Sequence, residues 1–143
     1  MELKEGCKVF VDTAPIIYFI EDHPYFGSIA AEMFAMMSKG HIEVTTSVLT
    51  FVEVLTMPYK TGRMDIVGTY KEFFYNSRGF SVSNINADVA ILAAKIRGRY
   101  GFKTPDALQL AAFEDLACDI FITNDVQLKK YNESKVIILS EMV

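Results

Sequence analysis

The sequence has few of the residues that build disulfide frameworks and zinc sites. Its two cysteines, Cys7 and Cys118, are too few for a disulfide framework, and neither has the Cys-x-x-Cys or Cys/His spacing of a zinc site. We interpret both as small buried residues in a reducing compartment. Of the two histidines, His23 lies in a turn-like segment beside Pro24 and His41 precedes a short strand, so we expect both at the surface.

An excess of positive charge is also missing. The chain has 14 Lys plus Arg against 18 Asp plus Glu, a net charge of −4. This balance excludes a protein that coats nucleic acid without specificity, because such binding depends on a basic field. It does not exclude a nuclease that keeps a local acidic metal site.

Long apolar runs and internal repeats are absent from the sequence. No apolar run approaches the roughly 20 residues that a membrane-spanning helix needs. The N-terminal segment MELKEGCK is charged and has no signal-peptide h-region. We therefore expect a cytoplasmic protein that does not contact a membrane. Without a linker or low-complexity segment, residues 1–143 are expected to form a single domain.

The segment CKVFVDTAPIIYFIE, at residues 7–21, is the one around which the rest is arranged. Its first apolar run ends on Asp12, and a second apolar run begins directly after Pro15. This pattern predicts a buried strand, a tight turn and a helix with Pro15 at its first position, where the missing N–H costs no hydrogen bond. Ligands of open α/β sheets bind outside the carboxyl ends of the strands, so Asp12 lies where such proteins keep their chemistry.

Strand-like and helix-like segments alternate along the remainder of the chain. The expected strands cover residues 9–11, 42–45, 80–82, 120–122 and 136–139, and the expected helices cover residues 25–39, 48–57, 64–77, 87–100 and a stretch from 104, with a further start at 126. Because strands and helices alternate and the central strand segments are apolar, the pattern predicts an α/β fold with a parallel sheet covered by helices on both faces.

Local signals mark where these helices begin and end. The expected N-caps are Thr46 or Ser47, Asn86 and Thr104. Pro105 suits the first position of its helix, whereas Pro58 is expected in a loop. Gly40 and Gly101 are expected to close the helices that precede them.

Glu53 is an isolated acid within the apolar segment of residues 48–57 and needs an explanation. A fully buried, unpaired carboxylate would be costly. Three roles remain open: a capping-box partner of Thr50, an ion-pair partner of a lysine, or a ligand that points into a cleft and helps to hold a cation.

Acidic residues recur at the places where a parallel sheet would bring them together. Asp12 and Asp125 each follow an apolar strand, and Asp106 lies in the first turn of a helix. Glu53 lies in a helix that starts directly after a strand. Because strand ends and the following helix starts share one edge of a parallel sheet, we expect these four carboxylates to converge there.

Carboxylates in such a cluster repel one another unless a cation neutralises them. Oxygen ligands without His or Cys select Mg²⁺ or Mn²⁺ over zinc or copper. A divalent ion held by acids lowers the pKa of a bound water and neutralises a phosphate transition state, so the cluster indicates hydrolytic phosphoryl transfer. Arg97, Arg99 and Lys103, just before Asp106, are candidates for phosphate contacts, the alternative being an ordinary solvated helix end.

Four segments carry a resemblance to a known family. They are VDTAPIIYFIE at 11–21, TSVLTFVEVL at 46–55, TPDALQLAA at 104–112 and FITNDVQL at 121–128. In this order and spacing the chain resembles PIN-domain ribonucleases, and most closely the VapC-type toxins of toxin–antitoxin pairs. Each motif alone is weak, and the four together span nearly the whole chain.

The resemblance implies a fold, a site and partners. It implies a PIN-like, Rossmann-like sheet of five parallel strands in the order 3-2-1-4-5, with metal-site acids at Asp12, Glu53, Asp106 and Asp125 and a hydroxyl residue at Thr123. It further implies Mg²⁺- or Mn²⁺-dependent cleavage of RNA, a homodimer and a cognate antitoxin protein that blocks the site. The family often has Asn or a bulky residue after Asp-Thr, where this chain has Ala14 and Pro15. That departure leaves the acids intact but alters the first turn.

Two other functions compete with a metal-dependent endoribonuclease. A phosphatase with an aspartyl nucleophile usually has a second acid two residues after the first, and that position is Ala14 here. The main alternative is a catalytically inactive PIN-like module that binds proteins. The presence of all four acids argues against it.

Overall fold

The apolar run before Asp12 forms the central strand of one parallel sheet. The computed structural model describes residues 3–142. Its strands are β1 (Lys8–Val11), β2 (Glu43–Ser47), β3 (Phe80–Ser83), β4 (Ile120–Thr123) and β5 (Val136–Ile138). They pair in the order β3-β2-β1-β4-β5, and all four pairings are parallel. The predicted fold class and strand order are confirmed.

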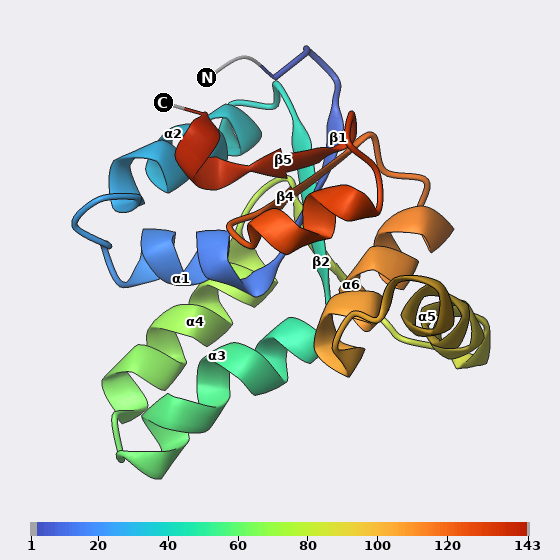
Figure 1. Ribbon diagram of the computed structural model, residues 1–143. Helices are drawn as coiled ribbons and strands as arrows, with labels where there is room; N and C mark the ends of the chain where they lie inside the picture. The colour runs from blue at the N-terminus through green and yellow to red at the C-terminus, as the bar shows by residue number, and fades with distance from the viewer. Residues whose placement is uncertain (1–2, 143) are drawn as a thin grey trace.

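Helices connect these strands and cover both faces of the sheet. They are α1 (Thr13–Ile20), α2 (Gly27–Ser38), α3 (Leu49–Lys60), α4 (Met64–Asn76), α5 (Ala87–Tyr100) and α6 (Thr104–Asp115), with short 3₁₀ helices η1 (Val126–Lys130) and η2 (Leu139–Glu141). Figure 1 shows α1 to α4 on one side of the strands and α5 and α6 on the other. In the same view α3 and α4 pack side by side and extend away from the sheet.

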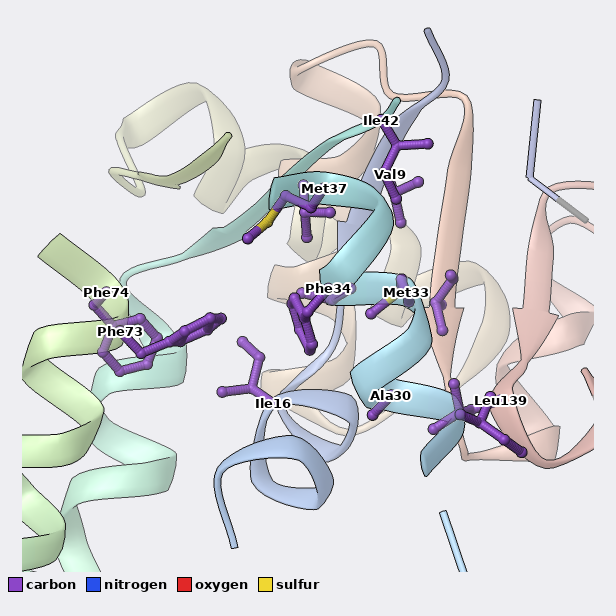
Figure 2. Packing of buried hydrophobic residues seen from close by; sticks show 14 of the residues in the cluster. Val9, Ile16, Ala30, Met33, Phe34, Met37, Ile42, Phe73, Phe74 and Leu139 are labelled. Atoms are coloured by element: carbon purple, nitrogen blue, oxygen red, sulfur yellow. The ribbon is translucent and has the colours of Figure 1, made fainter. Parts of the chain in front are cut away.

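Apolar side chains fill the space on both faces. Figure 2 shows the larger cluster, in which Met33 and Phe34 of α2 lie between Ile16 of α1 and the strands, with Phe73 of α4 close by. The other cluster is centred on Phe10, whose ring stacks on Phe121 and meets Phe113 edge-on. Because neighbouring residues of β1 point to opposite faces, one strand supports both clusters.

Two helices begin earlier than their sequence signals suggest. The carboxylate of Asp12 accepts the N–H of Thr13 and caps α1, so Pro15 is the third helical residue rather than the first. Proline is tolerated there because the first four N–H groups of a helix have no intrahelical partner. Lys103 takes the N-cap position of α6, and Thr104, expected as the cap, is its first helical residue. The caps expected at Asn86 and Gly101 are confirmed.

The segment around α3 departs most from expectation. Thr46 and Ser47 were expected as N-caps, but they are the last residues of β2, and Val48 is the N-cap of α3. The Ser47 hydroxyl nevertheless accepts the N–H of Leu49, the first helical residue, at 3.3 Å. Pro58 was expected in a loop and lies instead inside α3, which continues to Lys60. Pro58 is buried in the last turn of the helix and has no N–H to donate to the carbonyl of Val54, so α3 forms at the cost of that hydrogen bond.

In the part of the chain that the structure describes, none of the helices is long and apolar enough to cross a membrane.

Replacement of Phe10 by alanine tests how strongly the apolar cluster around this ring depends on the central strand. We expect Phe10→Ala to lower the free energy of unfolding by about 3 to 5 kcal/mol, because a ring in contact with two others leaves a cavity. Ile91→Ala, at a side chain of α5 that is 57% exposed, should change it by less than about 0.5 kcal/mol. Urea denaturation of the three proteins measures this difference, and equal losses would contradict the proposed role of Phe10.

Candidate metal centre

Asp12 lies where β1 meets α1 and is bonded on both sides. Its Oδ1 accepts the N–H of Thr13 at 2.8 Å, and its Oδ2 accepts the hydroxyl of Thr123 at 2.9 Å. Burial raises the pKa of Asp12 above its usual value, and these two hydrogen bonds partly oppose that rise. The negative charges of Glu53 and Asp125 raise the pKa of Asp12 further, which places both side chains in its electrostatic surroundings.

Thr123 connects Asp12 to Asp125. It is the last residue of β4 and is fully buried. Its hydroxyl donates to Asp12 and accepts the N–H of Asp125 at 3.1 Å. Asp125 in turn caps η1 by accepting the N–H of Gln127 at 3.0 Å. The hydroxyl therefore fixes two acids from two adjacent strand ends relative to each other.

Asp106 faces the same two acids from the first turn of α6. Burial raises the pKa of Asp106 to about 6, and the charges of Asp12 and Asp125 add to the effect. Lys103 acts in the opposite direction and lowers the pKa of Asp106. An acid at the N-terminus of a helix normally has a lowered pKa, so burial, together with the neighbouring negative charges, outweighs the helix dipole here.

Glu53 reaches this group from α3. Its side chain is exposed, and its Oε1 accepts the hydroxyl of Thr13 at 2.7 Å. The structure rejects the capping-box explanation, because α3 is capped by Val48 and Thr50 lies within the helix. Among the described residues, no ion pair joins Glu53 to a lysine or arginine. The hydrogen bond to Thr13 places Glu53 beside the end of β1, and its role in holding a cation stays a prediction.

The four acids do not form a closed cage. Among residues 3–142, no group of three or more His, Cys, Asp or Glu side chains is close enough to hold one metal ion. A cavity of about 330 Å³ opens beside Asp106 and Asp125. Its other lining residues include Lys103 and Lys130, so two positive side chains flank two of the acids.

The three basic candidates for phosphate contacts separate in the structure. Lys103 lines the cavity with the acids. Arg97 instead donates from Nε to the carbonyl of Phe102 at 2.9 Å, and Arg99 lies over the ring of Tyr100. Lys130, which was not predicted from the sequence, reaches the cavity from the end of η1. Lys130 follows Asp125 by five residues in a segment expected to start a helix, and this spacing indicated that the two side chains could lie near each other.

Both histidines and both cysteines lie outside this group of acids. His41 contacts Glu5 and is exposed, as expected. His23 was expected at the surface but is half-buried, because its Nδ1 accepts the N–H groups of Tyr25 and Phe26. Cys7 and Cys118 are free thiols and buried, as expected.

Several buried polar side chains were also missed. Thr13, Thr46, Thr50 and Gln109 are all buried and form hydrogen bonds close to the acids. Of these, Gln109 could have been recognised from the sequence. It lies among the apolar residues of LQLAA, at 108–112, and a glutamine buried there needs a hydrogen-bond partner.

A PIN domain model matches residues 9–134 of the chain. Among solved structures, VapBC2 from Rickettsia felis bound to promoter DNA is similar over 92% of this chain and 98% of its own, with a TM-score of 0.74 and 12% identity. VapC20 of Mycobacterium tuberculosis, described as a sarcin–ricin loop cleaving toxin, matches 87% and 95% of the two chains with a TM-score of 0.70 and 18% identity. DNA-bound VapBC from Salmonella typhimurium matches 93% and 98% with a TM-score of 0.73 and 15% identity. At these identities the similarity concerns the fold. A comparison with curated protein sequences finds no match.

The raised pKa of Asp106 leads to a prediction for the metal-free protein. Between the unfolded value near 3.8 and the folded value of about 6, the folded state binds more protons, so Asp106 reduces stability as the pH rises through this window. We expect Asp106→Asn to raise the free energy of unfolding by about 1 kcal/mol at pH 7.5 in EDTA, a value discounted for partial exposure. The gain should disappear by about pH 4.

Urea denaturation at the two pH values measures this effect, with Glu133→Gln at an exposed loop position as the control. A variant Asp106→Asn that is no more stable than the parent at pH 7.5 would contradict the crowding of charge at this site.

Proposed function

The chain belongs to the PIN domain family, and from this premise we propose that it is a Mg²⁺- or Mn²⁺-dependent endoribonuclease. The observation that carries the proposal is the mutual effect of the acids. Asp12 and Asp106 both have raised pKa values because they are buried near other carboxylates. A site built this way holds unfavourable negative charge until a cation neutralises it.

The donor set fits a hard divalent ion. Asp12, Glu53, Asp106 and Asp125 offer carboxylate oxygens, the ligands that Mg²⁺ and Mn²⁺ prefer. Among the described residues no three of these side chains are close enough to hold one ion, so an ion bound here would keep several of its waters, as Mg²⁺ usually does. These four side chains would hold the ion, some directly and others through water.

Bound there, a divalent ion would supply a water of lowered pKa and positive charge for a phosphodiester transition state. The protein's own residues orient the donors. Thr123 favours the ionised form of Asp12 by donating to it, and Thr13 turns Glu53 toward the end of β1. Lys103 and Lys130 line the cavity where the phosphates of an RNA strand would approach the acids.

We further propose that the nuclease is the toxin of a toxin–antitoxin pair. The similar structures from Rickettsia felis and Salmonella typhimurium are VapBC proteins, and their fold is shared by this chain. The chain also exposes a group of large apolar side chains on α3 and α4, namely Val52, Met57, Tyr59, Met64 and Tyr75. Exposed apolar groups of this kind suit protein contacts, and we propose a cognate antitoxin and a second copy of the chain as the partners.

Loss of one acid should abolish cleavage without unfolding the protein. We expect Asp12→Asn and Asp106→Asn each to reduce the rate of RNA cleavage in Mn²⁺ by at least about 100-fold, because each removes a charge that holds the ion. Glu133→Gln should cleave like the parent. Initial rates on a mixed RNA pool, with and without EDTA, measure this. Cleavage by Asp12→Asn at the parental rate would refute the mechanism, and a parent that neither binds Mn²⁺ nor cuts RNA would favour an inactive binding module.

The lysines of the cavity should contribute to RNA binding rather than to the chemistry. In an Asp12→Asn background, Lys103→Gln and Lys130→Gln should each reduce the slope of log K against log salt by about 0.7, the value for one phosphate contact to a single strand. Lys71→Gln, exposed on α4 and outside the cavity, should leave the slope unchanged. Fluorescence anisotropy with a labelled single-stranded RNA measures these slopes, and equal slopes for all three variants would exclude the proposed contacts.

A further inference from the structure

A chain of buried polar side chains joins the elements that carry the acids. Its members are Thr46 and Ser47 at the end of β2, Thr50 in α3 and Gln109 in α6. The exposed fraction is 0% for the first three and 1% for Gln109. Among the described residues, every buried side-chain nitrogen or oxygen has a hydrogen-bond partner, so these groups are satisfied by one another and by the backbone.

The contacts form one continuous path. The hydroxyl of Ser47 lies 2.6 Å from Oε1 of Gln109, and Nε2 of Gln109 lies 3.0 Å from the hydroxyl of Thr50. The Thr50 and Thr46 hydroxyls are 2.8 Å apart. The path ends at the carbonyl oxygen of Val11, 2.8 Å from the Thr46 hydroxyl.

Counting protons fixes the direction of this path. A carbonyl only accepts, so Thr46 must donate its single proton to Val11. Thr46 can then only accept from Thr50, whose own proton is thereby used. The Thr50 hydroxyl therefore needs a donor from its other neighbour, and Gln109 must present its NH₂ group rather than its oxygen. Ser47 then donates to the amide oxygen. Only one arrangement satisfies all four groups.

The path connects positions next to three of the four acids. Val11 directly precedes Asp12, and Gln109 follows Asp106 by one helical turn. Thr50 precedes Glu53 by one turn, and residues three apart lie on neighbouring parts of a helix surface. The Thr50 hydroxyl also lies 3.5 Å from that of Thr13, which donates to Glu53. The Thr13 proton goes to Glu53, 2.7 Å away, because an ionised carboxylate can only accept.

We propose that Gln109 is the positioning residue of the acidic site, and that its NH₂ group, by donating to Thr50, fixes α6 and α3 to the end of β1 and so sets the spacing of Asp106, Glu53 and Asp12. This inference rests on the proposed metal-binding function. Gln109 does not touch the cavity and acts through Thr50. A glutamine is required because it joins an acceptor and a donor in one planar group, whereas an apolar residue supplies neither.

Two substitutions at Gln109 separate the donor from mere packing. Gln109→Met keeps the length and removes both polar atoms. Gln109→Glu keeps the shape. Once ionised, its carboxylate can only accept and leaves Thr50 without a donor, and because burial raises the pKa of a glutamate at this position, that form needs alkaline pH. We expect Gln109→Met to weaken Mn²⁺ binding at pH 7.5 by about 10-fold or more, as is typical when the group orienting a ligand is lost. Titration calorimetry of the metal-free proteins measures the affinities.

A pair of substitutions at Thr50 provides rescue and guards against a variant that fails to fold. Thr50→Val removes the hydroxyl and should weaken Mn²⁺ binding as Gln109→Met does, whereas Thr50→Ser restores it and should bind within about twofold of the parent. Thr45→Val is the matched control. Thr45 is also buried in β2, but its hydroxyl donates to the carbonyl of Ser81 on β3 and not toward α3 or α6. Thr45→Val should lower the melting temperature and leave the Mn²⁺ affinity within about twofold.

The direction of the path has its own measurement. A protonated carboxyl carries an O–H that can donate to Thr50, so the melting temperature that Gln109→Glu loses at about pH 9.5 in EDTA, where the buried carboxyl is ionised, should be largely recovered at about pH 5.5. The loss caused by Gln109→Met should be the same at both pH values. Equal losses for the two variants at both pH values would overturn the assigned direction.

The outcomes also distinguish this inference from the proposed function. A parent protein that binds no Mn²⁺ overturns both. A parent that binds Mn²⁺, together with Gln109→Met that binds equally well, overturns only the positioning role. The same holds if Thr45→Val weakens binding as strongly as Thr50→Val, because the effect is then general destabilisation.

Discussion

The carboxylates at one edge of the sheet repel one another, and the rest of the structure has to hold them together against this repulsion. Burial raises the pKa values of Asp12 and Asp106, and neighbouring acids raise them further. Such a group would separate if its members lay on flexible segments. Here each acid is attached to a strand end or a helix, and the Thr123 hydroxyl holds Asp12 and Asp125 together. The two apolar clusters around β1 stabilise the fold and so offset the unfavourable free energy of bringing the acids together.

Much of the fold follows from local patterns in the sequence. Apolar runs such as residues 9–11 and 120–122 are short, and the segments between them have helical periodicity, which together specify a parallel sheet. Errors arose where a polar residue has a distant partner. Thr46 and Ser47 were interpreted as N-caps, but their hydroxyls bond to Val11 and to Gln109. A partner 62 residues away, as for Ser47, leaves no trace in a local pattern.

The same distinction applies to the candidate site. Its acids could be anticipated because the topology of a parallel sheet assigns strand ends to one edge, whatever their separation in sequence. Most of the residues around the acids could not, apart from Thr123 and Lys103, which were named, and Gln109, whose apolar neighbours were a signal. Arg97 was grouped with Lys103 from proximity in sequence, yet it donates to a backbone carbonyl while Lys103 lines the cavity. Lys130 and Thr50 depend on how helices are oriented about their axes, which a sequence without tertiary contacts does not specify.

Asp12 serves both as a member of the acidic group and as the N-cap of α1. This double use restricts which residues evolution can place there. Glutamate would preserve the charge, but its longer side chain is a poor N-cap and would move the carboxylate away from Thr123. Asparagine would preserve the cap and abolish the charge. Neither replacement keeps both properties, so fewer residues are tolerated at this position than metal binding alone would allow. A lineage that loses the activity can still retain a polar residue here, because the cap keeps α1 intact.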